Sequence, residues 1–144
     1  MMKKKCGKRD SGDSADSGIV GILEKAELFS PFSGDELSFF VQRAERLPLA
    51  AGQALFAEGD RAESLYVVIS GSIEIVARDQ SILAQFVSGD SLGELEFLTK
   101  GGRNATARAL EDSLVLAFPA KGRDMEESLA ERPAMAARIL YSFL

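Results

Sequence analysis

Short β-prone segments separated by turn residues dominate this chain from Leu47 to Phe118. Glycine or aspartate recurs at intervals of about eight to twelve positions, which is typical of short antiparallel strands. Many short strands with frequent turns indicate a sandwich or a barrel. The expected strands are Leu47–Leu49, Ala54–Glu58, Leu65–Ile69, Ser72–Ala77, Ile82–Phe86, Ala105–Ala109 and Leu114–Phe118.

Two local patterns refine this expectation. Gly59, Gly71 and Gly89 stand where tight turns need a positive φ or a close backbone approach. The sequence Ile73-Glu74-Ile75 alternates between apolar and charged residues. Such alternation predicts a strand with one buried face and one solvated face, with Glu74 on the solvated face.

Helical signals precede the β region. Residues 19–26 have the pattern of a short amphipathic helix, and aromatic residues in the turn that follows are expected to be buried. Ser33 and Glu36 have the spacing of a capping box, so a helix is expected to start there. Leu37 and Phe40 lie on one face of that helix, together with Val41 and Ala44.

The two ends of the chain differ in character. Residues 1–17 contain almost no apolar side chains, so they are expected to form a disordered tail. Near the C-terminus, residues 124–130 have a helical pattern, and Pro133 suits the first turn of a further helix. We therefore expect one domain over residues 18–144, with helices on both sides of the β region.

Composition limits the possible functions. The chain has no histidine, which removes the commonest general base and metal ligand, so neither an enzyme nor a metal site is expected. Its single cysteine, Cys6, allows no internal disulfide and suggests a reducing compartment such as the cytoplasm. The net charge of −5 argues against a nucleic-acid surface. No apolar run approaches the roughly 20 residues of a membrane span.

The segment from Gly93 to Thr106 carries the strongest chemical signal. Its sequence, Gly-Glu-Leu-Glu-Phe-Leu-Thr-Lys-Gly-Gly-Arg-Asn-Ala-Thr, places Glu94 and Arg103 on either side of an apolar turn and a double glycine. Backbone N–H groups opposite an arginine can bind an anion, and a nearby carboxylate can accept a hydrogen bond from a hydroxyl. This combination suggests a sugar phosphate. The alternative is that Glu94 and Arg103 form only a surface ion pair.

These residues, together with others in order along the chain, resemble the cyclic-nucleotide-binding domain family. The further matching segments are Ala51-Gly52-Gln53, Phe56-Ala57-Glu58-Gly59-Asp60, residues 65–75, Ser88-Gly89-Asp90 and residues 109–113. The resemblance implies a β-roll, which is a jelly-roll-like double-stranded β-helix, with flanking helices. This agrees with the mainly β architecture expected from the spacing of the turns.

The resemblance also implies roles for individual residues. Glu94 would accept a hydrogen bond from the ribose 2′-hydroxyl, and the planar fork of Arg103 would bind two oxygens of the cyclic phosphate. The backbone at Gly93, Leu95, Asn104 and Ala105 would complete the phosphate site. The implied ligand is cAMP in preference to cGMP, with no other cofactor.

Three functions remain open at this stage. The first is a sensor that relays ligand binding through its C-terminal helix, which is also a possible homodimer contact. The second is a ligand-independent interaction domain with the same fold. The third is the sensor half of a longer transcription regulator. No helix-turn-helix motif is found before Leu144, so DNA binding by this chain itself is not expected.

Overall fold

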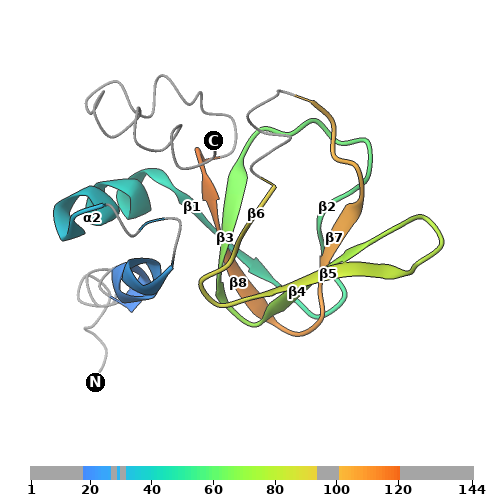
Figure 1. The fold of residues 1–144 in the computed structure, drawn as a ribbon, viewed down its shortest axis with the longest axis horizontal. Coiled ribbons are helices and arrows are strands. Elements are labelled where there is room, and N and C mark those ends of the chain that lie inside the picture. The colour runs from blue at the N-terminus through green and yellow to red at the C-terminus, as the bar shows by residue number, and fades with distance from the viewer. Residues whose placement is uncertain (1–17, 27–28, 30–31, 94–100, 121–144) are drawn as a thin grey trace.

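Two four-stranded antiparallel sheets face each other, and helices cover one of them (Figure 1). A computed structural model describes residues 18–26, 29, 32–93 and 101–120. This architecture confirms the predicted mainly β fold with helices beside it. The helices expected at residues 124–130 and from Pro133, and the tail of residues 1–17, lie outside the described residues. The strands are β1 (Glu45–Leu49), β2 (Ala54–Phe56), β3 (Leu65–Ser70), β4 (Ser72–Val76), β5 (Ile82–Val87), β6 (Ser91–Leu92), β7 (Thr106–Ala109) and β8 (Ser113–Phe118).

The chain alternates between the two sheets. One sheet has the strand order β1-β8-β3-β6, and the other has the order β2-β7-β4-β5. Consecutive strands often lie in different sheets, so the chain rolls up around a common interior. Gly93 follows β6 directly, and Arg103 lies three residues before β7.

The turn between β3 and β4, which lie in different sheets, was predicted from the sequence. Gly71 has a φ of +84° there, and a Cβ atom at this position would lie 2.7 Å from the carbonyl oxygen of Asp112. The same small space lets the Ser72 N–H donate to Ser113 Oγ at 3.1 Å. Two features therefore require glycine at position 71. One is its positive φ, and the other is the close approach of the backbone at the start of β8.

Alternating side chains of β3 divide the apolar residues into two clusters. Leu65, Val67 and Ile69 face the helices, whereas Tyr66 and Val68 face the interior of the roll. We call the first cluster the helical core; its buried members also include Ile19, Leu23, Phe29, Phe32, Leu37, Phe40, Leu116 and Phe118. We call the second the roll core; its buried members also include Leu49, Ile73, Leu92, Ala107, Ala109 and Val115.

The helix α2 (Gly34–Arg43) begins as predicted. Ser33 Oγ accepts a hydrogen bond from the Glu36 N–H, and Glu36 Oε1 accepts one from the Ser33 N–H, at 3.2 and 3.0 Å. This reciprocal cap satisfies two backbone donors at the helix start. On the buried side of α2, the ring of Phe40 stacks on that of Phe118 in β8, with 4.3 Å between centroids.

Glu74 departs from the prediction. Its relative exposure is only 4%, so it does not lie on a solvated face. Arg108 stands opposite it on β7, and Arg108 Nε lies 2.7 Å from Glu74 Oε2. Arg108 Nη1 also donates to Gln80 Oε1 at 3.0 Å. The alternation was interpreted correctly as a strand, but the neighbouring strand supplies an arginine that covers the carboxylate.

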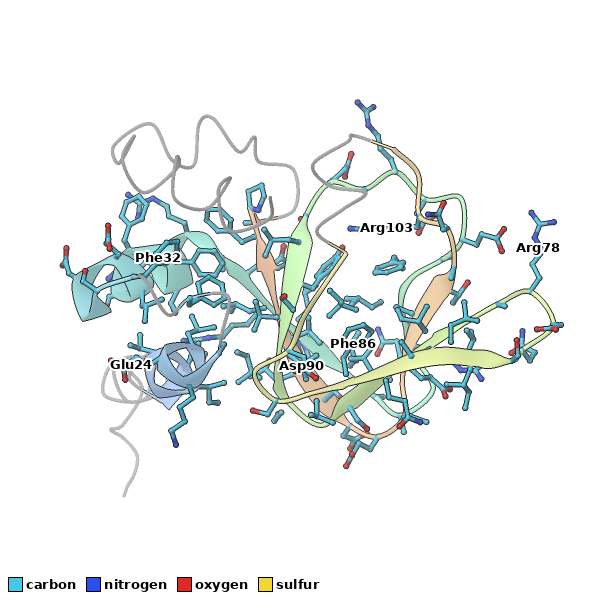
Figure 2. The ribbon with its side chains drawn as sticks, in the orientation of Figure 1. Glu24, Phe32, Arg78, Phe86, Asp90 and Arg103 are labelled. Carbon is cyan, nitrogen blue, oxygen red and sulfur yellow. The ribbon has the colours of Figure 1, made fainter. Side chains whose placement is uncertain are left out.

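The hairpin of β4 and β5 extends away from the helices (Figure 1). Arg78 lies at its tip and points outward (Figure 2). β5 is an edge strand, and its Ile82, Leu83 and Val87 are 56, 60 and 54% exposed. Among the described residues, no helix is long and apolar enough to cross a membrane.

Candidate functional site

Two backbone hydrogen bonds hold Arg103 against the loop that follows β2. Its N–H donates to the carbonyl oxygen of Asp60 at 2.7 Å, and its carbonyl oxygen accepts from the Gly59 N–H at 2.8 Å. Gly102 next to it pairs with Arg61 in an isolated β-bridge. The segment before β7 is thus fixed against the loop between β2 and β3.

The side chain of Arg103 points into the roll between the two sheets (Figure 2). Its relative exposure is 3%, which rules out the surface position that the ion-pair alternative requires. Nη1 donates to the carbonyl oxygen of Gly93 at 2.7 Å, and Nη2 donates to the carbonyl oxygen of Ser64 at 2.6 Å. Hydrogen bonds from a charged donor are worth about 1.5–3 kcal/mol each.

Two aromatic rings line the guanidinium. Its central carbon lies 4.4 Å from the ring centroid of Phe56 and 5.4 Å from that of Tyr66. The two rings are themselves nearly parallel, with centroids 5.8 Å apart. A cation over an aromatic face gains about 0.5–2 kcal/mol, with the larger values in desolvated places. Phe56 and Tyr66 therefore hold the guanidinium plane in one orientation.

Gly93 approaches the same guanidinium closely. A Cβ atom at Gly93 would lie 2.5 Å from Arg103 Nη1, and the φ of Gly93 is +79°. Only glycine allows this backbone to reach the arginine in this conformation. The structure thus brings Gly93 and Arg103 into contact across a sequence separation of 10 residues.

The other expected site residues are distributed as follows. Asn104 is exposed beside Arg103, and Ala105 is buried at 8% relative exposure. Glu94 and Leu95 lie outside the described residues. No group of three or more metal-ligating side chains is found in the described ranges.

A groove of about 490 Å³ has Phe56 and Tyr66 among its lining residues. Its apolar walls include Leu47 and Leu49 of β1, and Arg103 does not line it. Its polar lining residues include Glu45, Asp60, Glu63 and Arg61. Three carboxylates against one guanidinium make this groove a poor place for an anion.

Three residues of the Arg103 environment were missed by the sequence analysis: Phe56, Ser64 and Tyr66. Phe56 and Tyr66 were placed in strands and in the segments that carry the family resemblance, but they received no role in the site, and neither did Ser64. The alternation of β3 could have placed Tyr66 inside the roll, since it shares a face with Val68. The contact of Ser64 with Arg103 depends on the path of a loop, which has no periodic signal.

The family model described as "Cyclic nucleotide-binding domain" matches residues 46–125, which is more than half of the chain. This chain belongs to the cyclic nucleotide-binding domain family. The match covers all eight strands except the first residue of β1.

Relatives of this cyclic nucleotide-binding domain include parts of longer proteins. Lysophospholipase NTE1 from Chaetomium globosum is 36% identical over 100 residues, which are 66% of this chain and 6% of that protein. The chain thus corresponds to a small fraction of the length of the curated relatives that it matches.

Two solved structures are similar across most of the chain. The N-terminal domain of a transcriptional regulator from Streptomyces coelicolor A3(2) is 29% identical, with a TM-score of 0.74 over 85% of this chain and 89% of that one. The catabolite activator protein of Thermus thermophilus is 28% identical, with a TM-score of 0.66 over 81% of this chain and 55% of that one.

Proposed function

We propose that this chain binds a cyclic nucleoside monophosphate at Arg103 and acts as the regulatory module of an output domain. The observation that carries the proposal is the buried guanidinium of Arg103, oriented by two rings and approached by the backbone of Gly93. A desolvated and preorganised cation attracts an anion more strongly than a surface arginine does. A cyclic phosphate carries a single negative charge, so one guanidinium and nearby backbone N–H groups suit it.

The finer features of this proposal follow the family resemblance. Glu94 accepts from the ribose 2′-hydroxyl, the backbone at Gly93, Leu95, Asn104 and Ala105 completes the phosphate site, and the ligand is cAMP in preference to cGMP. The C-terminal helix beginning at Pro133 relays the signal and forms the homodimer contact. The domain spans residues 18–144, acts in the cytoplasm, and neither catalyses a reaction nor binds nucleic acid itself.

Two relatives support the proposal that this chain regulates an output domain. A lysophospholipase and a transcriptional regulator both contain a domain similar to this chain. The same sensor therefore fits regulation of an enzyme or of a DNA-binding domain, in each case through a part of the protein that is not the β-roll.

A ligand-independent interaction domain is the second candidate. The observation that favours it is that the carbonyl groups of Gly93 and Ser64 already accept hydrogen bonds from Arg103. An arginine with internal partners can serve the fold alone. The two candidates differ in whether the chain binds cyclic nucleotides in solution.

Isothermal titration calorimetry with cAMP and cGMP tests the proposal. We expect binding to the wild-type chain, with cAMP the tighter ligand, and a loss of affinity of at least about 10–100-fold in Arg103→Ala, because charge-assisted hydrogen bonds are removed. Arg78→Ala is the matched control, since its side chain is 87% exposed. The thermal midpoint of each variant shows whether it folds. Equal affinities in folded Arg103→Ala and wild type would assign binding to another site.

A second titration tests the role of Glu94. Wild-type chain should bind 2′-deoxy-cAMP about 10-fold or more weakly than cAMP, because a charged acceptor loses its hydroxyl partner. Glu94→Gln should bind the two ligands with more similar affinities. If Glu94→Gln discriminates between them as strongly as wild type does, Glu94 does not contact the 2′-hydroxyl.

A further inference from the structure

Ser64 joins two parts of the molecule that are distant in sequence. It lies directly before β3 and is 4% exposed. Its carbonyl oxygen accepts from Arg103 Nη2 at 2.6 Å, and its hydroxyl donates to the carbonyl oxygen of Pro119 at 2.8 Å. One small buried residue thus contacts both the guanidinium and the end of β8.

Pro119 leads directly to the helical core. The preceding residue, Phe118, is fully buried and stacks on Phe40 of α2. The ring of Phe29 packs edge-on against Phe40, with 5.0 Å between centroids. A continuous series of contacts therefore runs from Arg103 through Ser64, Pro119 and Phe118 to α2.

We propose that Ser64 is the positioning residue through which occupancy of the Arg103 site changes the stability of α2. This inference rests on the proposed ligand site. An anion that draws the guanidinium toward itself removes a donor from the Ser64 carbonyl. A buried carbonyl without a donor is unfavourable, so the loop at Ser64 adjusts, and its hydroxyl transmits the adjustment to Pro119.

Such coupling requires that α2 has a different stability in two arrangements of the Arg103 guanidinium. In the first, the guanidinium binds the carbonyl group of Ser64, and the end of β8 is held at its present position under α2. With the guanidinium on a phosphate, that restraint is altered. A ligand shifts the stability of α2 only as far as it binds the two arrangements with different affinity. Contact alone does not establish coupling, so it has to be measured by combining variants.

Hydrogen exchange of α2 amides, with and without saturating cAMP, measures the coupling. In wild type, we expect cAMP to change the exchange rates of residues 34–43 by at least about threefold. Ser64→Ala keeps the carbonyl but lacks the hydroxyl. It should bind cAMP with a Kd within about threefold of wild type while losing most of the change in α2.

Two variants serve as controls. Ser113→Ala removes a buried hydroxyl whose partners are backbone groups of residues 72 and 111, and it should retain the full response of α2. Ser64→Thr keeps a hydroxyl and should restore the response. If Ser64→Ala does not fold, Phe118→Leu replaces it, because this change removes the stacking on Phe40 at the other end of the path.

The outcomes separate this inference from the proposed function. If cAMP binds but α2 exchange is unchanged in wild type, or if folded Ser64→Ala responds fully, the role of Ser64 is refuted and the ligand site stands. If wild type binds no cyclic nucleotide, the ligand site is refuted, and the coupling between Arg103 and α2 is tested in the ligand-free proteins. Arg103→Lys should then change the exchange rates of α2 amides in wild type but not in Ser64→Ala. If the effects of the two substitutions are additive instead, the role of Ser64 is refuted as well.

Discussion

At the scale of single residues, the environment of Arg103 explains its orientation. Two carbonyl groups and two aromatic rings fix the guanidinium, and Gly93 is small enough to let the backbone reach it. None of these groups lies next to Arg103 in the sequence. The orientation is therefore a property of the folded roll, and substitutions at Phe56 or Tyr66 should alter the orientation of the arginine.

Tyr66 gives this environment a measurable pH dependence. Burial raises the pKa of Tyr66 above 10.0, although the charge of Arg103 and a hydrogen bond from it act in the opposite direction. The folded chain therefore holds the phenol proton more tightly than the unfolded chain does. Stability from this group is fully present below the unfolded pKa of about 10, and it is lost as the pH rises through the higher folded pKa.

The expected result is a steeper fall of the urea midpoint above about pH 10 in wild type than in Tyr66→Phe. Urea unfolding followed by circular dichroism over a pH series provides the measurement. All other residues are the same in the two proteins, so the comparison isolates the phenol of Tyr66. Identical slopes in the two proteins would contradict the raised pKa.

At the scale of elements, local sequence patterns predicted most helices and strands. The capping box at Ser33, the turn at Gly71 and most strands were found from local patterns, and the structure confirms them. The two-residue strand β6 was not predicted, because it is too short to show alternation. The burial of Glu74 was not predicted either, since it depends on the register that brings Arg108 opposite.

The candidate site shows the same limit. The motif predicted that the backbone at Gly93 and the side chain of Arg103 belong to one phosphate site. In the structure, Arg103 Nη1 lies 2.7 Å from the carbonyl oxygen of Gly93. Phe56, Ser64 and Tyr66 contact Arg103 through the packing of separate strands and loops, which no single stretch of sequence encodes. The roles assigned to individual site residues remain predictions.

The turn between β3 and β4 offers a test at this scale. Gly71→Ala should lower the free energy of unfolding by about 2–4 kcal/mol, because a Cβ atom strains the backbone and overlaps the start of β8. Gly52→Ala is the matched control: its φ is +87°, but nothing lies within 4 Å of the added carbon. It should lose only about 1–2 kcal/mol in the same urea titration. Equal losses would show that the close approach is unimportant.

At the scale of the whole molecule, one sheet is shared by two cores. The sheet β1-β8-β3-β6 contributes Leu65 and Val67 to the helical core and Val68 and Val115 to the roll core. The helices before β1 therefore belong to the same folding unit as the roll. The domain start at residue 18 stays a prediction.

Deletion tests that boundary. A chain lacking residues 1–17 should melt within about 2 °C of the full chain, because a tail with so few apolar residues is expected to bury little surface. Leu23→Ala is the contrast, since Leu23 is fully buried in the helical core. It should lower stability by about 2–5 kcal/mol. If the deletion lowers the thermal midpoint by much more than about 2 °C, the domain begins before residue 18.

The exposed edge of the roll has a consequence for handling the protein. The strand β5 contains no charged residue and no proline, and three of its apolar side chains face solvent. Natural edges are commonly protected by lysine or proline, and an edge without them favours strand-to-strand pairing between copies. Concentrated preparations should therefore self-associate through β5. The Leu83→Lys variant should associate less through β5. Comparing its oligomeric state with that of wild type distinguishes this association from a functional dimer.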